Sequence, residues 1–253
     1  MGEHVAPTTP AKKKRSNIFW NIVGVVGELL ITFAIIVGLF SVWQLYWTTY
    51  QVSGQVSQTI ASYEEEHQPS KRTLGEVRTD DPPAFDREVG DGEVYGIVHV
   101  PTWDWMKIPL AEGTTSYVLD QGWAGHYDMT TQPGGVGNFS IAGHRRTYGN
   151  NFRWIDRLTQ GDKVVVEVDD HYLVYSMVSS EIIDATDPTQ MRVVAPVIDD
   201  VSWSETPTER WMTMTTCHPE YGNWQRYIVH LKFESWTPKD TGVPAELVDE
   251  PTN

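Results

Sequence analysis

The sequence contains one cysteine, Cys217, so no disulfide bond can form within the chain. The residues before it, 211–216, alternate as a β-strand does, which places Trp211, Thr213, Thr215 and Cys217 on one face. A turn with proline and glycine follows, so a thiol at this strand end can be exposed enough to react. Cys217 is therefore a candidate nucleophile, and the alternative is a buried cysteine that packs as a small apolar residue.

Arg226 follows Cys217 by nine residues and stands at the start of the next apolar run, 225–233. If the two strands form an antiparallel hairpin, Arg226 and Cys217 lie near opposite positions, and opposed residues share a face. A guanidinium beside the thiol would favour the reactive thiolate. The alternative for Arg226 alone is a solvated strand end.

A cysteine nucleophile also needs a group that carries protons, and histidine suits this role near neutral pH. His144 ends the predicted strand 138–144 and follows Ala142 and Gly143, which leave room beside it. Position alone favours His144 or His126 and does not choose between them. The other six histidines lie in the tail, in the stalk, within strands or beside turns: His4, His67, His99, His171, His218 and His230.

The start of the chain is typical of a membrane anchor. Residues 1–17 are polar and end in a basic cluster, and residues 18–47 are mostly apolar and long enough to cross a bilayer. Basic residues before the span predict a cytoplasmic tail, a single transmembrane helix in the plasma membrane and an extracytoplasmic remainder. A cleaved signal peptide fits worse, because the apolar run is too long and no small-residue cleavage site follows. Aromatic residues flank the span, as expected at membrane interfaces: Trp20, Trp43, Tyr46, Trp47 and Tyr50.

The remainder divides into three parts. Residues 48–92 predict an extracytoplasmic stalk and linker, since their second half is rich in proline, glycine and charge. Residues 93–236 contain about eight β-prone runs and few helices, which predicts an all-β, closed or nearly closed barrel. Residues 237–253 are polar and predict a flexible tail. The formal net charge of -15 argues against nucleic-acid binding. It indicates either solubility or attraction of an amine-bearing substrate.

Several motifs occur in an order that resembles the sortase family. Residues 138–145, NFSIAGHR, resemble the segment around the sortase histidine, and residues 213–217, TMTTC, resemble the TLxTC motif with Met214 at the leucine position. Arg226 matches the sortase arginine, and residues 125–127, GHY, resemble a segment upstream of the histidine strand. The resemblance covers roughly residues 93–236.

Two further features resemble class E, the housekeeping-like branch of actinobacteria. One is GELLIT at residues 27–32 of the anchor, and the other is His218-Pro219 directly after the cysteine. Glu28 within the first motif is unusual in a membrane helix. Both a snorkelling acid and a helix-pairing role remain open for it.

The resemblance implies a closed eight-stranded sortase-type β-barrel and a cysteine transpeptidase. Such an enzyme cleaves an LAxTG- or LPxTG-like C-terminal sorting signal of a secreted protein between Thr and Gly. It then transfers the Thr carboxyl from a thioester to an amine of a lipid II-like peptidoglycan precursor. The resemblance implies no cofactor, and the sequence has no ligand spacing that demands a metal.

The resemblance also implies residue roles. Cys217 would be the nucleophile, His144 the proton carrier and Arg226 the group that steadies substrate and oxyanion. Substrate or oxyanion support is implied for three further residues, Thr216, Thr215 and His126. The acidic loop 184–209 would help to wall the signal-binding groove, or its acids would simply be solvated.

Other functions remain as alternatives. One is a sortase that polymerises pilins, and another is a membrane-tethered, non-catalytic β-barrel that binds a partner. An L,D-transpeptidase would place His and Cys within one short segment, and a papain-like peptidase has Cys before His; neither pattern is present. A metal enzyme lacks HxxxH-like spacing.

Overall fold

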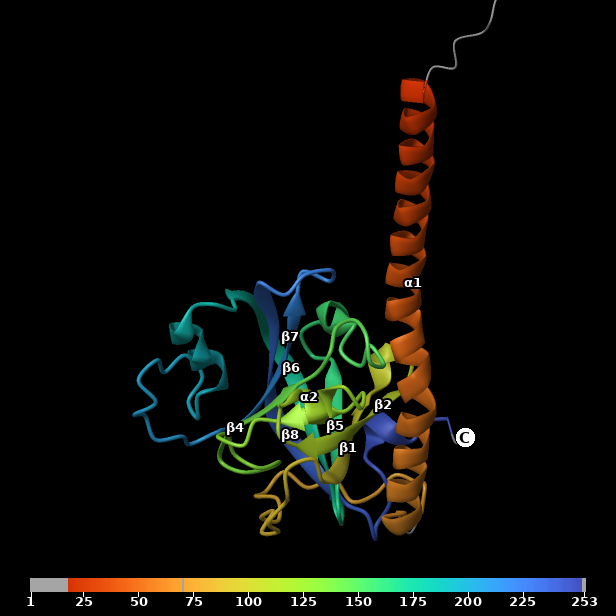
Figure 1. The fold of residues 1–253 in the computed structure, drawn as a ribbon. Coiled ribbons are helices and arrows are strands. Elements are labelled where there is room, and N and C mark those ends of the chain that lie inside the picture. Colours follow the sequence, from red (N-terminus) through yellow and green to blue (C-terminus); the bar gives the residue numbers. More distant parts are fainter. Residues whose placement is uncertain (1–17, 70, 252–253) are drawn as a thin grey trace, which may run out of the picture. The chain divides into compact units, whose positions relative to one another are not determined.

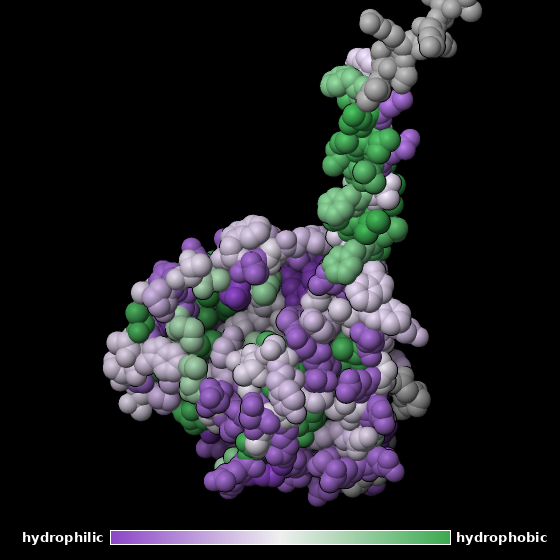
Figure 2. Space-filling view, in the orientation of Figure 1, coloured by the Kyte–Doolittle hydropathy of each residue, from purple (hydrophilic) through white to green (hydrophobic). Residues whose placement is uncertain are grey.

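The first element is a long helix, α1 (Ile18–Glu66), in the computed structural model of the chain, which describes residues 18–69 and 71–251. The chain divides into two units, Met1–Gln44 and Leu45–Asn253, and α1 contributes to both. Figure 1 shows the length of α1. Part of this helix is long and apolar enough to cross a membrane, and no residue of that window is buried. Figure 2 shows mostly apolar residues on the displayed face of the part of α1 that belongs to the first unit. The predicted basic tail, residues 1–17, lies outside the described residues.

The second unit is built on eight strands that close into a barrel in the order β1-β2-β3-β4-β7-β8-β6-β5 (Figure 1). The β2–β3 and β4–β7 pairs are parallel, and the other neighbouring pairs are antiparallel. The strands are β1 (Val94–Val100), β2 (Met106–Glu112), β3 (Ala124–His126), β4 (Gly137–Ala142), β5 (Lys163–Val168), β6 (His171–Asp184), β7 (Arg210–His218) and β8 (Gln225–Pro238). The predicted closed eight-stranded barrel is confirmed, and the helices of this unit after α1 are short, such as α2 (Ser116–Leu119).

Side chains of β7 alternate between the barrel interior and the opposite face of the strand. Met212 and Met214 belong to the main core cluster, together with large buried side chains such as Phe139 and Phe152. Successive strand residues point to opposite faces. Cys217 therefore shares the opposite face of β7 with the threonines that alternate with the two methionines.

That opposite face is covered by the β6–β7 loop, which contains the 3₁₀ helix η3 (Pro188–Val194). Val193 and Val194 pack with Ile183 and Ile228 of the barrel. The buried Asn138 side chain of β4 donates from Nδ2 to two carbonyl oxygens of the loop, at 3.0 and 3.1 Å. The loop is thus fastened over β4, β7 and β8.

The described part of the predicted flexible tail, residues 237–251, is instead packed against the barrel. Val243 and Leu247 are buried in a small apolar cluster with β5 and β6 side chains. Glu250 is also buried and pairs with His99 of β1 at 2.8 Å. The expectation of a flexible tail is thereby corrected for these residues, because a few apolar side chains and one buried carboxylate fix an otherwise polar segment.

The predicted stalk and linker also has more structure than expected. The helix α1 continues to Glu66. Beyond it, Leu74 and Arg78 form isolated β-bridges with Val243 and Trp236. This segment therefore runs along the barrel and the C-terminal segment.

Candidate active site

Cys217 and Arg226 occupy directly opposed positions of the antiparallel β7–β8 pair. This placement is the one that the spacing of the two residues predicts. Cys217 is partly exposed. The Arg226 guanidinium donates from Nη1 to the carbonyl oxygens of Asn223 and Gln225, at 2.8 and 2.9 Å. These bonds hold the guanidinium at the end of the β7–β8 turn.

A cavity of about 330 Å³ brings Cys217 together with His144. Its wall comes from the segment after β4 and from the β7–β8 turn. The lining residues are His144, Arg145, Arg146, Thr147, Cys217, Glu220, Tyr221 and Gly222. Arg226 does not line this cavity. It lies beside the cavity because it is paired with Cys217 across the β7–β8 strands. A thiol and an imidazole facing one cavity can together carry out nucleophilic attack and proton transfer.

His144 is held by a carboxylate that sequence reasoning missed. Asp120, which directly follows α2, lies 2.8 Å from Nε2 of His144 through Oδ1. The ring of Tyr148 packs on the imidazole, with centroids 5.4 Å apart. The contact joins residues 24 positions apart, and no spacing in the sequence indicates it. A carboxylate on one ring nitrogen fixes the tautomer and orientation of an imidazole.

His126, the other histidine candidate, lies in a different environment. It is fully buried and pairs with Glu112 at 2.9 Å through Nδ1. Its Nε2 lies 3.1 Å from the Thr131 carbonyl oxygen and 3.0 Å from the Thr130 hydroxyl. The structure therefore places His144, and not His126, at the cavity that Cys217 lines.

The two threonines before Cys217 are placed differently from each other. The hydroxyl of Thr216 donates to the carbonyl oxygen of Gly143 at 2.6 Å, and Thr216 is buried. A hydroxyl has one proton, so in this arrangement it cannot also donate to an oxyanion. Thr216 thus joins β7 to the residue before His144, and oxyanion support by Thr216 stays a prediction. Thr215 lies on the face of Cys217.

Tyr127 belongs to the GHY segment, and its side chain contacts Thr215 on the β7 face that carries Cys217. Its hydroxyl and that of Thr215 are 2.8 Å apart. Burial raises the pKa of Tyr127, and the bond with Thr215 and the positive charge of Arg226 act in the opposite direction. The phenol therefore stays protonated at neutral pH and can donate a hydrogen bond.

His218, directly after the nucleophile candidate, is occupied elsewhere. The buried Arg145 donates from Nη1 to Nδ1 of His218 at 2.8 Å and from Nη2 to Asp156 at 2.7 Å. Burial and the positive charge of Arg145 lower the pKa of His218. The ring is therefore a neutral hydrogen-bond acceptor. Among the described residues, no group of three or more His, Cys, Asp or Glu side chains is arranged to hold a metal ion.

Comparisons with known proteins agree on one family. A family model described as Sortase domain matches residues 98–234. Sortase SrtE1 of Streptomyces coelicolor is 35% identical over 88% of this chain, which spans 60% of the length of that relative. Sortase SrtE2 of the same organism is 29% identical over 86% of this chain and 84% of the relative.

Solved structures give the same result. The SrtA sortase from Actinomyces oris is 44% identical, with a TM-score of 0.64 over 70% of this chain and 100% of the other. Sortase E1 from Streptomyces coelicolor, crystallised with a tripeptide in the active site, is 37% identical. Its TM-score is 0.55 over 63% of this chain and 99% of the other.

Proposed function

Because this chain belongs to the sortase family, and resembles its class E members, we propose that it is a cysteine transpeptidase that cleaves C-terminal sorting signals of secreted proteins. The signal would be LAxTG- or LPxTG-like, with cleavage between Thr and Gly. The observation that carries the proposal is that Cys217 and His144 line one cavity while Arg226 lies opposite Cys217. These three residues are the catalytic set we propose.

In the first half of the reaction, the Cys217 thiolate attacks the carbonyl carbon of the signal threonine. A carbon–sulfur bond forms, and the carbonyl oxygen gains negative charge that Arg226 stabilises. The carbon–nitrogen bond to glycine then breaks, and His144 donates a proton to the leaving amine. The product is a thioester on Cys217, which divides one difficult acyl transfer into two easier steps.

In the second half, an amine of a lipid II-like peptidoglycan precursor attacks the thioester carbon. His144 takes a proton from the incoming amine, a new amide bond forms and the carbon–sulfur bond breaks. The Cys217 thiolate is regenerated. The chemistry needs no redox partner, because each bond that forms is balanced by one that breaks.

We place the bound sorting signal at the exposed end of β7, beside Cys217 and the cavity that His144 also lines. The face of β7 that carries Thr215 adjoins β4 and lies under the β6–β7 loop. Tyr127 and Trp203 each pack against the apolar cluster that contains Val193 and Val194. An apolar surface with a few placed hydroxyls beside Cys217 suits an extended peptide with small and apolar side chains. Tyr127 would contact the signal next to Cys217, and Thr215 would support it by holding the Tyr127 hydroxyl.

The apolar part of α1 would anchor the enzyme in the plasma membrane as a single span. The basic residues before the span favour a cytoplasmic N-terminus and an extracytoplasmic barrel. In this arrangement the catalytic unit meets secreted proteins and cell-wall precursors on the same side of the membrane.

The full chain in detergent is tested with quenched fluorescent peptides that carry LAxTG, LPxTG or scrambled signals, and with a glycine-based amine. Mass spectrometry should find cleavage after Thr and transfer to the amine, both lost in Cys217→Ala. Transfer to a lysine side chain in preference to glycine would favour the pilin-polymerising alternative. No cleavage, with Cys217 unreactive toward a vinyl-sulfone signal mimic, would favour the non-catalytic binding module.

A further inference from the structure

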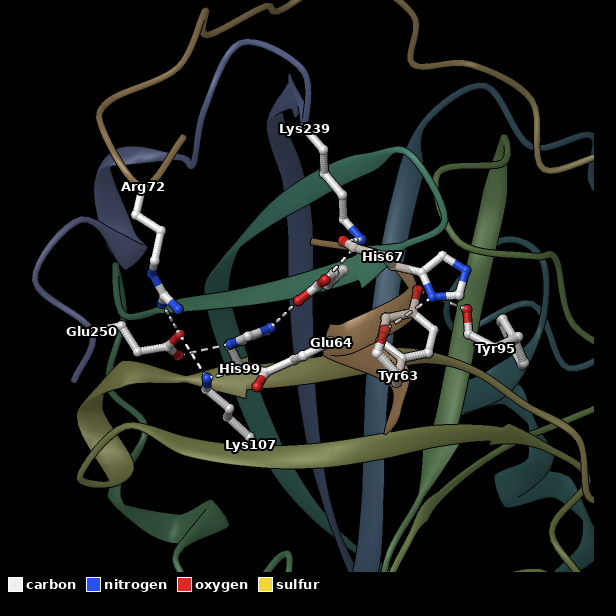
Figure 3. Close-up of polar contacts among 10 residues, drawn as sticks. Tyr63, Glu64, His67, Arg72, Tyr95, His99, Lys107, Lys239 and Glu250 are labelled. Carbon is white, nitrogen blue, oxygen red and sulfur yellow. Dashed lines mark hydrogen bonds and ion pairs between the residues drawn. The ribbon is translucent and has the colours of Figure 1, made fainter. Parts of the chain in front are cut away.

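The second half of α1 is fastened to the barrel at its C-terminal end by a cluster of ion pairs. Lys107 of β2 lies 2.6 Å from Glu64 of the helix and 3.1 Å from Glu250 of the C-terminal segment. His99 pairs with Glu250 at 2.8 Å (Figure 3). Its other ring nitrogen lies 2.8 Å from Glu167. The Lys107–Glu64 pair joins the helix itself, and the buried His99 pairs hold Glu250, the second partner of Lys107.

The aromatic residue next to Glu64 adds a second attachment. Tyr63 is buried, and its ring stacks on that of His67 with centroids 4.3 Å apart (Figure 3). The Lys239 ammonium of the C-terminal segment lies over the Tyr63 ring, 5.3 Å from its centroid. We call residues 49–66 of α1 the docked segment.

Further toward its N-terminal end, the docked segment touches two glycines of the catalytic unit. A Cβ built on Gly122 would lie 2.9 Å from Cγ2 of Val56 and 3.5 Å from Cγ2 of Val52. A Cβ built on Gly149 would lie 3.5 Å from Cγ2 of Val52. Val52 is buried although its helical neighbours on either side are exposed. The two valines therefore pack directly against the backbone at these glycines.

The two glycines belong to the loops that carry His144 and its carboxylate partner. Gly122 is two residues after Asp120, and Gly149 is next to Tyr148, whose ring packs on the imidazole. The loops are tied to each other by Asn151, which donates to the Trp123 carbonyl oxygen at 2.8 Å. A shift at either glycine would therefore reach the Asp120–His144 pair.

The loop after His144 has a backbone that needs outside support. Thr147, Tyr148 and Asn150 have positive φ angles of 67°, 43° and 53°, and Gly149 between them has a φ of 93°. Non-glycine residues in this region are unfavourable and persist where the surrounding structure holds them. The docked segment is one of the surfaces that holds this loop.

We propose that the docked segment positions His144 for catalysis, through the contacts of Val52 and Val56 with the loops at Gly122 and Gly149. The helix that reaches the membrane would thus also complete the catalytic site. Proton transfer depends steeply on the placement of the imidazole, so a small displacement lowers the catalytic rate. Val52 and Val56 are positioning residues in this scheme, since they act through the loops and touch no reacting atom.

This inference rests on the proposed transpeptidase function, and its test uses the full chain in detergent. We would compare Val52→Ser, Val56→Ser and the double variant with Gln55→Ser and Gln58→Ser, which alter exposed positions of the same helix. The valine changes should lower kcat by about tenfold with KM within about twofold, because the imidazole moves while the signal groove stays. The glutamine controls should match the parent. Val52→Ile, which keeps an apolar β-branched side chain at the contact, should retain most of the parental kcat.

Hydrogen exchange, read by mass spectrometry, gives a measure that does not depend on activity. Amides of residues 144–152 should exchange faster in the valine variants, while those of β5 and β6 keep their protection. If the parent cleaves no peptide but these amides respond, the proposed function fails and the support of the loop by the helix stands. Unchanged exchange and kcat in the double variant would overturn the inference. Faster exchange with unchanged kcat, or an equal loss in the glutamine controls, would overturn it as well.

Discussion

Cys217 of β7 and Arg226 of β8 face each other across an antiparallel strand pair. Opposed residues in such pairs have Cβ atoms about 4.5–5.5 Å apart and project from the same face. The hairpin therefore places the Cβ atoms of Cys217 and Arg226 close together before any substrate binds. The Arg226 bonds to the carbonyl oxygens of Asn223 and Gln225 limit the motion of its side chain. This preorganisation is the basis of the first prediction.

Replacing Arg226 should lower the rate of acyl transfer and leave the fold intact. Arg226→Ala should reduce kcat/KM by about 10²–10³, because it removes the charge proposed to stabilise the oxyanion. Arg226→Lys should fall between parent and alanine variant, since an ammonium lacks the planar fork of a guanidinium. Steady-state peptide cleavage measures both. Arg78→Ala, which removes an arginine paired with Glu76 away from Cys217, is the control. An alanine variant with parental kcat/KM would contradict the role of Arg226.

Replacing Asp120 should mainly affect kcat. Asp120→Ala should lower it by about 10–100-fold, because the His144 imidazole loses the carboxylate that orients it at 2.8 Å. Asp120→Asn should retain more activity, since its amide oxygen can still accept from Nε2–H. KM for the signal peptide should change little in both variants. A rise in KM with unchanged kcat would show instead that Asp120 binds substrate.

A methyl group added at Gly143 should displace His144. A Cβ at this position would lie 2.7 Å from two ring atoms of Phe152, which is fully buried in the barrel core and has no room to retreat. Gly143→Ala should therefore cost about 1–3 kcal/mol of unfolding free energy and most of the activity. Urea unfolding followed by tryptophan fluorescence measures the first effect. Gly90→Ala is the matched control, because its Cβ would make only an ordinary contact, 3.6 Å from Glu93. Equal stability of the two variants would contradict the steric account.

The features predicted well from the sequence are those set by local periodicity. Alternation along β7 separates Met212 and Met214, which enter the core, from the face that carries Cys217. Only nine positions separate Cys217 from Arg226, so a single short loop joins their strands and pairs the two residues. Both features were predictable because they depend on residues that are near each other in the sequence.

The features that sequence reasoning missed depend on contacts between distant residues. Asp120 reaches His144 only because α2 ends beside the loop that follows β4, and the spacing of the two residues carries no sign of this. Glu250 pairs with His99 across 151 positions, within a segment whose composition resembles a mobile tail. The separation between His126 and His144 also needed the structure, since both follow small residues near strand ends.

The buried cluster around His99 should make stability depend on pH. Burial by itself would lower the pKa of His99, but its hydrogen bonds to Glu167 and Glu250 outweigh burial and raise it above 6.5. Burial would raise the pKa values of the two carboxyl groups, but the bonds to His99 lower both below 4.5. The stabilisation by His99 is therefore full below pH 6.5 and is lost as pH rises through its higher folded-state pKa. The stabilisation by the carboxylates is present above pH 4.5 and is lost as pH falls through their lower folded-state values.

The measurement is the unfolding free energy of parent and His99→Gln as a function of pH. The variant should be less stable by about 3 kcal/mol near pH 6, where a charged buried pair is broken. The difference should shrink as pH rises, because the parent imidazole then loses its own proton. The carboxylates keep cationic neighbours in both proteins, since Lys239 lies 2.7 Å from Glu167 and Lys107 lies 3.1 Å from Glu250. The change with pH is therefore assigned to His99. A constant difference from pH 6 to 9 would show that His99 stays in one protonation state over that range, which would contradict the predicted loss of its stabilisation.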